Sequence, residues 1–266
     1  MSATSTILRR ADANGVATLT LCNPENRNAL GLFAIDTLIV ALADVDKDAA
    51  IRAVVVAGEG PAFSAGHDLK EIQDHRGDED GGAAYFDKLM RRCVELMRAI
   101  VELPKPVIAA IEGVATAAGC QLVAACDLAI AGEAARFALP GVNIGLFCST
   151  PLVAVGRAVS RKAAMELALT GEPIDAARAE ALGLVNRVVP AGCALAEAQA
   201  LAARIASRPA AVTALGKRTF QAQIETTLAD AYRIASEAMV ENLALPQARE
   251  GVAAFLEKRP ARWSQP

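Results

Sequence analysis

Two glycine-containing turns, residues 62–72 and residues 111–122, have the residue types and spacing that favour chemistry. In each, small residues stand between an expected strand and an expected helix, which points backbone N–H groups into a cleft. Two such turns can aim two donors at one oxygen. That arrangement is an oxyanion hole, and each donor can stabilise a developing enolate by ~3 kcal/mol. The alternative is that the small residues only allow a helix to pack closely on a sheet.

Other segments approach known catalytic motifs without completing them. Residues 62–66 resemble a nucleophile elbow without its first glycine, and the only histidines are His67 and His75. No Ser…Asp…His order can be built from them, so a serine hydrolase is not expected. Gly216-Lys217 has no glycine five residues earlier, so it is not a phosphate-binding loop. Lys217 is interpreted as a lysine on a helix surface.

Composition narrows the classes of partner. The chain has 266 residues, of which 53% are hydrophobic, 4% aromatic and 21% charged, with a formal net charge of −3. This is enough to bury one large core or two small ones, and it argues against disorder. Without a basic excess, no nucleic-acid partner is expected. The expected partner is a small molecule or another protein.

Membrane and targeting signals are weak. The most apolar stretch, residues 107–131, is interrupted by Glu112, Gln121 and Asp127, so we interpret it as strand, turn, helix and strand rather than a membrane span. Residues 1–10 lack an apolar stretch long enough for a secretory signal. The expected location is cytoplasmic, with an abbreviated organelle address left open.

The six cysteines form no C-x-x-C pair, and several lie within apolar runs. They are interpreted as reduced core thiols rather than as metal ligands or disulfide partners. No metal site is expected.

Strand and helix patterns alternate along the first part of the chain. Residues 16–22 and 53–57 read as strands and residues 32–46 as a helix, which predicts an α/β fold with a mainly parallel sheet. Residues 73–82 are charged and glycine-rich and predict a mobile surface loop. From residue 161 helix follows helix, with one strand-like interlude at residues 184–189. We therefore expect a core over residues 1–190 and a helical region over residues 191–266. The apolar residues of these helices predict an oligomer.

With residues 24–30 upstream and residues 126–127 and 140–145 downstream, the two turns resemble the crotonase (enoyl-CoA hydratase/isomerase) superfamily. The resemblance covers nearly the whole chain, ending in residues 250–259. Residues 115–121 and 145–151 are similar to the subgroup called enoyl-CoA hydratase domain-containing protein 3. No single motif identifies the family, but the chain has five of its motifs in the same order as the family has them.

The resemblance implies a spiral of ββα units and C-terminal helices that drive trimerisation, often as a dimer of trimers. It also implies a site for acyl-CoA thioesters in fatty-acid metabolism, with no cofactor besides that ligand. The oxyanion donors would be the backbone N–H groups of His67 and Ala118. Arg27 would lie near the CoA phosphates. The remaining CoA contacts would be Ala65, His67, Asp68 and Leu69 at the adenine pocket, and the C-terminal pair Phe255 and Lys258, in some members across a subunit boundary.

Departures from the family bear on activity. Hydratases carry two glutamates at positions that here hold Gln121 and Gly141. Hydration needs groups that activate water and deliver a proton, and neither residue titrates usefully. Ala118 replaces a glycine, which is tolerable where φ is negative. Among other polar groups, the His67 side chain has the ordinary pKa best suited to proton transfer.

Two classes of function follow from this sequence. One is an enzyme of the lyase or isomerase class that stabilises a thioester enolate, although classical hydratase activity is not expected. The other is a non-catalytic acyl-CoA-binding or scaffold protein of fatty-acid metabolism.

Overall fold

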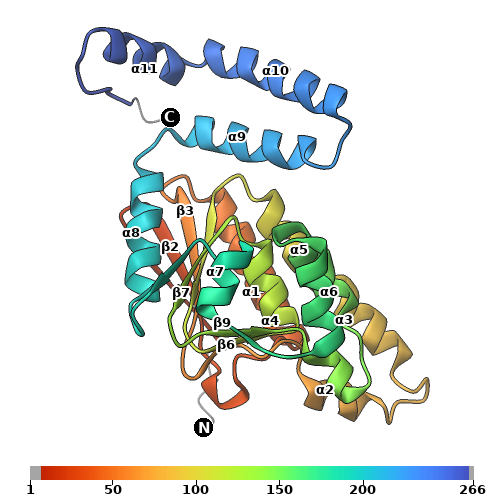
Figure 1. The fold of residues 1–266 in the computed structure, drawn as a ribbon. Helices are drawn as coiled ribbons and strands as arrows, with labels where there is room; N and C mark the ends of the chain where they lie inside the picture. The colour runs from red at the N-terminus through yellow and green to blue at the C-terminus, as the bar shows by residue number, and fades with distance from the viewer. Residues whose placement is uncertain (1–6, 264–266) are drawn as a thin grey trace.

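A computed structural model describes residues 7–263; part of the amino-terminal segment examined above for a targeting signal lies outside these residues. Its centre is a six-stranded sheet with the order β1-β2-β3-β5-β7-β10 (Figure 1). Within this sheet β2, β3, β5, β7 and β10 pair in parallel, and β1 adds an antiparallel edge strand. The strands are β1 (Leu8–Ala13), β2 (Val16–Leu21), β3 (Ala53–Gly58), β5 (Val107–Ile111), β7 (Leu128–Gly132) and β10 (Arg187–Val189).

A second sheet has four short strands in the order β4-β6-β8-β9. They are β4 (Ala62–Ser64), β6 (Val114–Thr116), β8 (Arg136–Ala138) and β9 (Ile174–Asp175). Each of β3, β5 and β7 is followed by one of these strands and then by helices, so the chain repeats a ββα unit. The predicted α/β class with a spiral of ββα units is confirmed.

The helices fill the space around the two sheets. They are α1 (Leu32–Lys47), α2 (Leu69–His75), α3 (Ala83–Glu102), α4 (Ala118–Ala125), α5 (Ser149–Ala158), α6 (Arg161–Thr170), α7 (Ala176–Leu182) and α8 (Ala194–Ala206). Two 3₁₀ turns, η1 (Pro24–Asn26) and η2 (Pro140–Ile144), complete the body.

Both faces of the large sheet are buried at its centre, because β3 and β5 carry no polar side chain. Val54 and Val56 face the main core with α1, α3 and α4. The alternate residues Val55 and Ile108 face α8 instead, as the period of two in a strand requires. Helix α8 approaches closely because the residues that it buries against the sheet are all small: Ala194, Ala198, Ala202 and Ala206.

The last three helices form an arm that stands apart from both sheets (Figure 1). They are α9 (Ala210–Gln223), α10 (Leu228–Ala244) and α11 (Pro246–Leu256). Helix α9 buries only Leu215, α11 only Ala254, and α10 no residue. Large apolar side chains remain exposed on the arm, including Leu228 at 74% and Phe255 at 83%. The division at residue 190 stays a prediction; α8 packs on the sheet, and the arm begins at α9.

The segment predicted as a loop is partly helical. Residues 73–75 complete α2, and only residues 76–82 form turns. His75, the last residue of α2, connects this helix to the turns and to α3. Its Nδ1 lies 2.7 Å from Asp78 Oδ2, and its ring stacks on that of Tyr85 with 3.7 Å between the ring centroids. No helix within residues 7–263 is both long and apolar enough to cross a membrane.

Candidate active site

The two glycine-containing turns meet in space. Thr116 Oγ1 donates a hydrogen bond to the carbonyl oxygen of Ala65 at 3.1 Å. Gly66 has a φ of +90°, and a Cβ at this position would lie 2.9 Å from Ala117 Cβ and 3.0 Å from the nitrogen of Ala118. Only glycine fits a left-handed conformation with such close neighbours. The close packing that was the alternative explanation for the small residues is therefore present. The same packing places the two turns that carry the predicted donors against each other.

Both predicted oxyanion donors are free. Ala118 is the first residue of α4, where an N–H group has no acceptor within the helix. Within residues 7–263, neither the Ala118 N–H nor the His67 N–H donates a hydrogen bond. The positive φ in this turn falls on Ala117, at 50°, so the methyl group of Ala118 causes no backbone strain. Strained backbone is often found at functional sites.

Two buried polar residues hold the first turn in place. Ser64 Oγ donates to the carbonyl of Asn28 at 2.8 Å and accepts from the N–H of Gly66 at 3.3 Å. The Asn28 side chain donates to the carbonyls of Glu59 at 2.9 Å and Ala62 at 2.8 Å. Sequence reasoning missed both residues as positioning groups. The available signal was an asparagine at the end of a polar, turn-like segment, residues 23–28, since asparagine tolerates the left-handed φ of 53° found here.

The His67 side chain is unsuited to proton donation. Its Nε2 is buried and has no hydrogen-bond partner among the described residues. Burial lowers the pKa of His67 to about 4, so the imidazole is neutral at pH 7. The expectation from its ordinary pKa is corrected for this reason. The predicted role of His67 is therefore limited to its backbone N–H group.

Gln121 occupies the first position at which the family has an acid. It lies on α4, is 3% exposed, and its Oε1 accepts a weak hydrogen bond from Cys93 Sγ at 3.9 Å. Burial raises the pKa of the Cys93 thiol to about 11. Both partners are therefore neutral at pH 7.

Gly141, the second such position, lies in η2 with no left-handed φ. A Cβ built on Gly141 would lie 2.9 Å from Cys148 Sγ and 3.0 Å from the carbonyl oxygen of Leu146. The Cys148 sulfur thus occupies the space into which a side chain at residue 141 would extend. Burial raises the pKa of the Cys148 thiol, partly offset by a hydrogen bond from the Gly141 backbone.

Five of the predicted CoA-binding residues lie close together. The Arg27 carbonyl accepts a hydrogen bond from Ala65 at 3.0 Å, which places the first predicted contact beside the first turn. Asp68 caps α2, where its Oδ1 accepts from the N–H of Lys70 at 2.9 Å. His67 and Leu69 flank it in sequence, and Leu69 is 51% exposed.

Phe255 and Lys258 are not brought to this site. They lie at the end of α11, whereas α2 is at the opposite end of the molecule (Figure 1). Within one copy the C-terminal pair therefore cannot contact a ligand beside α2.

The family of the chain follows from its similarity to known proteins. The model of the enoyl-CoA hydratase/isomerase family matches residues 11–266. The chain belongs to this family. Mouse enoyl-CoA hydratase domain-containing protein 3, mitochondrial, is 45% identical over 94% of this chain and 82% of its own length. The human protein is 46% identical over 94% and 81%.

Solved structures of family members have the same fold. A Mycobacterium smegmatis enoyl-CoA hydratase has a TM-score of 0.92 and 49% identity, covering 97% of this chain and 99% of its own. Human enoyl-CoA hydratase domain-containing protein 3 has a TM-score of 0.92 and 43% identity over 97% and 100%. The predicted superfamily and subgroup are confirmed.

The expected cytoplasmic location is wrong by the same comparison. The mouse, rat, frog and human relatives are all named as mitochondrial proteins. The expectation depended on the absence of a signal in residues 1–10, which is a weak basis for choosing a compartment.

Proposed function

We propose that the chain binds acyl-CoA thioesters and stabilises the thioester enolate with the backbone N–H groups of His67 and Ala118. The strongest support is that these two backbone N–H groups have no acceptor among residues 7–263. They lie on two turns that are joined by the hydrogen bond from Thr116 Oγ1 to the Ala65 carbonyl. A thioester oxygen held between two such donors gains ~3 kcal/mol from each as charge develops.

The same site favours chemistry without a strong acid or base. The Gln121 side chain accepts a hydrogen bond from the Cys93 thiol, and the space beside Gly141 is occupied by the Cys148 sulfur. A general acid or base contributes ~10²–10⁴-fold to a rate. Classical hydration is therefore expected to be slow, and these two positions also favour the second candidate function, acyl-CoA binding without turnover.

The proposal includes a trimer-based oligomer. The arm exposes large apolar side chains such as Leu228 and Phe255, which a second copy would cover. A neighbouring copy would also supply Phe255 and Lys258, since one copy cannot bring them to its own site. Light scattering at micromolar concentration tests this, and a monomeric mass would contradict it.

The experiment that tests the proposed function compares binding with turnover. Calorimetry measures the affinity for butyryl-CoA and for free CoA, and a screen measures turnover of enoyl-, 3-hydroxyacyl- and malonyl-type CoA esters. Tighter binding of the thioester than of free CoA supports the amide site. Turnover in the screen favours the enzyme, binding alone favours the binding protein, and absence of binding contradicts both.

A further inference from the structure

Lys217 is buried, contrary to its interpretation as a surface lysine. Its side chain is only 8% exposed, although it lies on α9 at the start of the arm. Its Nζ donates to Asp127 Oδ2 at 2.6 Å and to the carbonyls of Ile100 at 3.0 Å and Lys105 at 3.3 Å. An ammonium group has three N–H donors, so all of them have acceptors.

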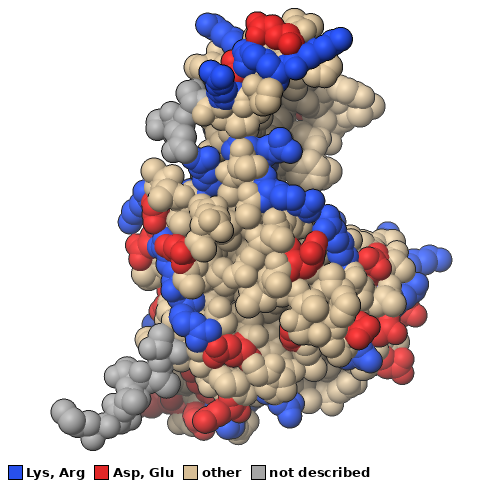
Figure 2. Space-filling model, turned by 90° about the vertical axis from the view of Figure 1, so that its left-hand side faces the viewer, with Lys and Arg blue, Asp and Glu red and all other residues tan. Residues whose placement is uncertain are grey.

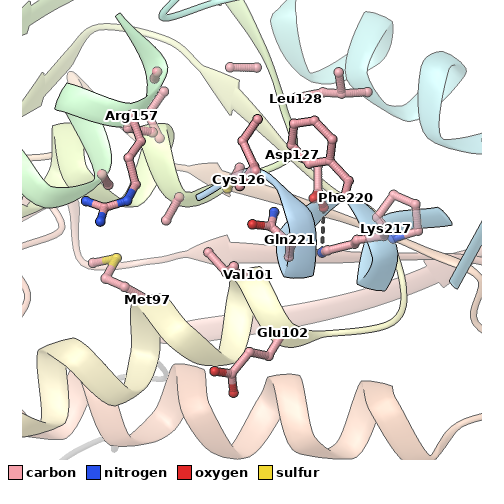
Figure 3. A pocket seen from close by; sticks show the side chains of 18 of the residues that line it. Met97, Val101, Glu102, Cys126, Asp127, Leu128, Arg157, Lys217, Phe220 and Gln221 are labelled. Carbon is pink, nitrogen blue, oxygen red and sulfur yellow. Dashed lines mark hydrogen bonds and ion pairs between the residues drawn. The ribbon is translucent and has the colours of Figure 1, made fainter. Parts of the chain in front are cut away.

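The acceptors come from parts of the body that are themselves fixed. Ile100 is in the last turns of α3, Lys105 lies between α3 and β5, and Asp127 precedes β7. Asp127 Oδ2 also accepts from the N–H of Val107 at 2.7 Å, which ties the carboxylate to β5. Lys217 thereby joins α9 to the ends of a core helix and two central strands. Figure 3 shows its contact with Asp127.

Apart from those of Lys217, few polar contacts between the arm and the body occur among residues 7–263. An open cavity of about 1320 Å³ lies between α3, α5 and α9, with Met97, Val101 and Phe220 among its lining residues (Figure 3). In the space-filling view the arm stands clear of a largely uncharged face of the body (Figure 2). At the far end of α9, Arg157 pairs with Glu225, but both are more than half exposed, and such pairs contribute little.

We infer that Lys217 is a positioning residue that fixes the direction in which the C-terminal arm leaves the body. Through that direction it determines where Phe255 and Lys258 meet the acyl-CoA site of a second copy. The inference rests on the proposed function, because it needs both the ligand and the oligomer. Leu215, the buried apolar residue of α9, supplies apolar contact area without a preferred direction. The three acceptors around Lys217 Nζ instead fix the position of that nitrogen, and with it that of α9.

The test uses a double variant, Lys217→Met with Asp127→Asn, which removes the pair without leaving a buried charge. The amide oxygen at residue 127 can still accept from Val107. Arg218→Met is the matched control, because Arg218 is the next residue of α9, is 69% exposed and, among the residues that the structure describes, pairs only with Glu241. Leu215→Ala is a second comparison that weakens packing and leaves the lysine in place.

Molar mass, melting temperature and the butyryl-CoA affinity are measured for each variant. The double variant is expected to melt cooperatively yet lose the oligomer and bind at least about tenfold more weakly, which is 1.4 kcal/mol. Arg218→Met should match wild type in all three measurements. Leu215→Ala should lower the melting temperature while the ligand-bound protein keeps its oligomeric mass.

A double variant with wild-type mass and affinity would overturn the inference and leave the proposed function standing. A wild-type chain that is monomeric and binds no acyl-CoA would refute both. If the double variant does not melt cooperatively, Lys217→Arg decides. This variant keeps a positive charge beside Asp127. Its planar guanidinium, however, cannot donate from a single nitrogen to the three acceptors that surround Lys217 Nζ. Weaker butyryl-CoA binding by this variant supports the inference, and unchanged affinity and mass contradict it.

Discussion

Restoring the two acids of the family requires a third substitution, at Cys148. A glutamate at residue 141 would place its Cβ 2.9 Å from Cys148 Sγ and 3.0 Å from the Leu146 carbonyl. Gly141 has no left-handed φ, so the obstacle is space and not backbone conformation. Overpacking of this kind costs about 1–3 kcal/mol. In a chain of this size each kcal/mol lowers the melting temperature by about 2–4 °C.

The double variant Gln121→Glu with Gly141→Glu should therefore melt below wild type and hydrate crotonyl-CoA little faster. Adding Cys148→Gly removes the closest contact and leaves the Leu146 carbonyl, so most but not all of the lost stability should return. Because the second carboxylate then has room beside the thioester, hydration should rise by ~10²–10⁴-fold for each group that becomes active.

The assay follows loss of the absorbance of the conjugated thioester, alongside a melting curve for every variant. Cys148→Gly alone is the control, since it creates the space without adding an acid and should not hydrate. Equal melting temperatures and equal hydration rates for the double and triple variants would refute the assignment of Cys148 as the obstacle.

The other predictions concern His67, Gly66 and Arg27. Because the unfolded imidazole binds a proton near pH 6.5 and the buried one only near 4, the free energy of unfolding should fall by up to about 3 kcal/mol as pH decreases from 6.5 to 4. His67→Gln should flatten this slope in denaturant titrations, and an unchanged slope would contradict the assignment. Gly66→Ala should abolish the preference for butyryl-CoA over free CoA in calorimetry, because its Cβ would meet the Ala118 nitrogen at 3.0 Å, whereas Gly77→Ala, at a residue without a left-handed φ, should not. Arg27→Ala should weaken CoA binding by about 1–3 kcal/mol and reduce its salt dependence; wild-type affinity would remove Arg27 from the site.

Much of the large sheet could be predicted because its strands are short apolar runs. The predicted strand at residues 53–57 corresponds to β3, and the strand, helix and strand expected within residues 107–131 correspond to β5, α4 and β7. The turn expected between β5 and α4 contains a short strand, β6. The second sheet could not be predicted as a unit. Three of its strands have only three residues, too few to show a period of two.

The candidate site was predictable where local backbone determines it. Small residues before two expected helices indicated turns that present backbone donors. The resemblance to the family implied that these donors are His67 and Ala118, and the positive φ lies on Ala117. The Ser64 and Asn28 hydrogen bonds and the burial of Lys217 depend on acceptors far away in sequence. No local pattern records such partners.

The measurement that tests the central claim most directly is the hydration rate of crotonyl-CoA by the unmodified chain, at a ligand concentration that calorimetry shows to be saturating. With both donors free and both acids replaced by Gln121 and Gly141, the ligand should bind and the rate should lie ~10²-fold or more below a typical enzyme turnover of ~10 s⁻¹. A rate near ~10 s⁻¹ would contradict the account, because another group would then be moving the proton.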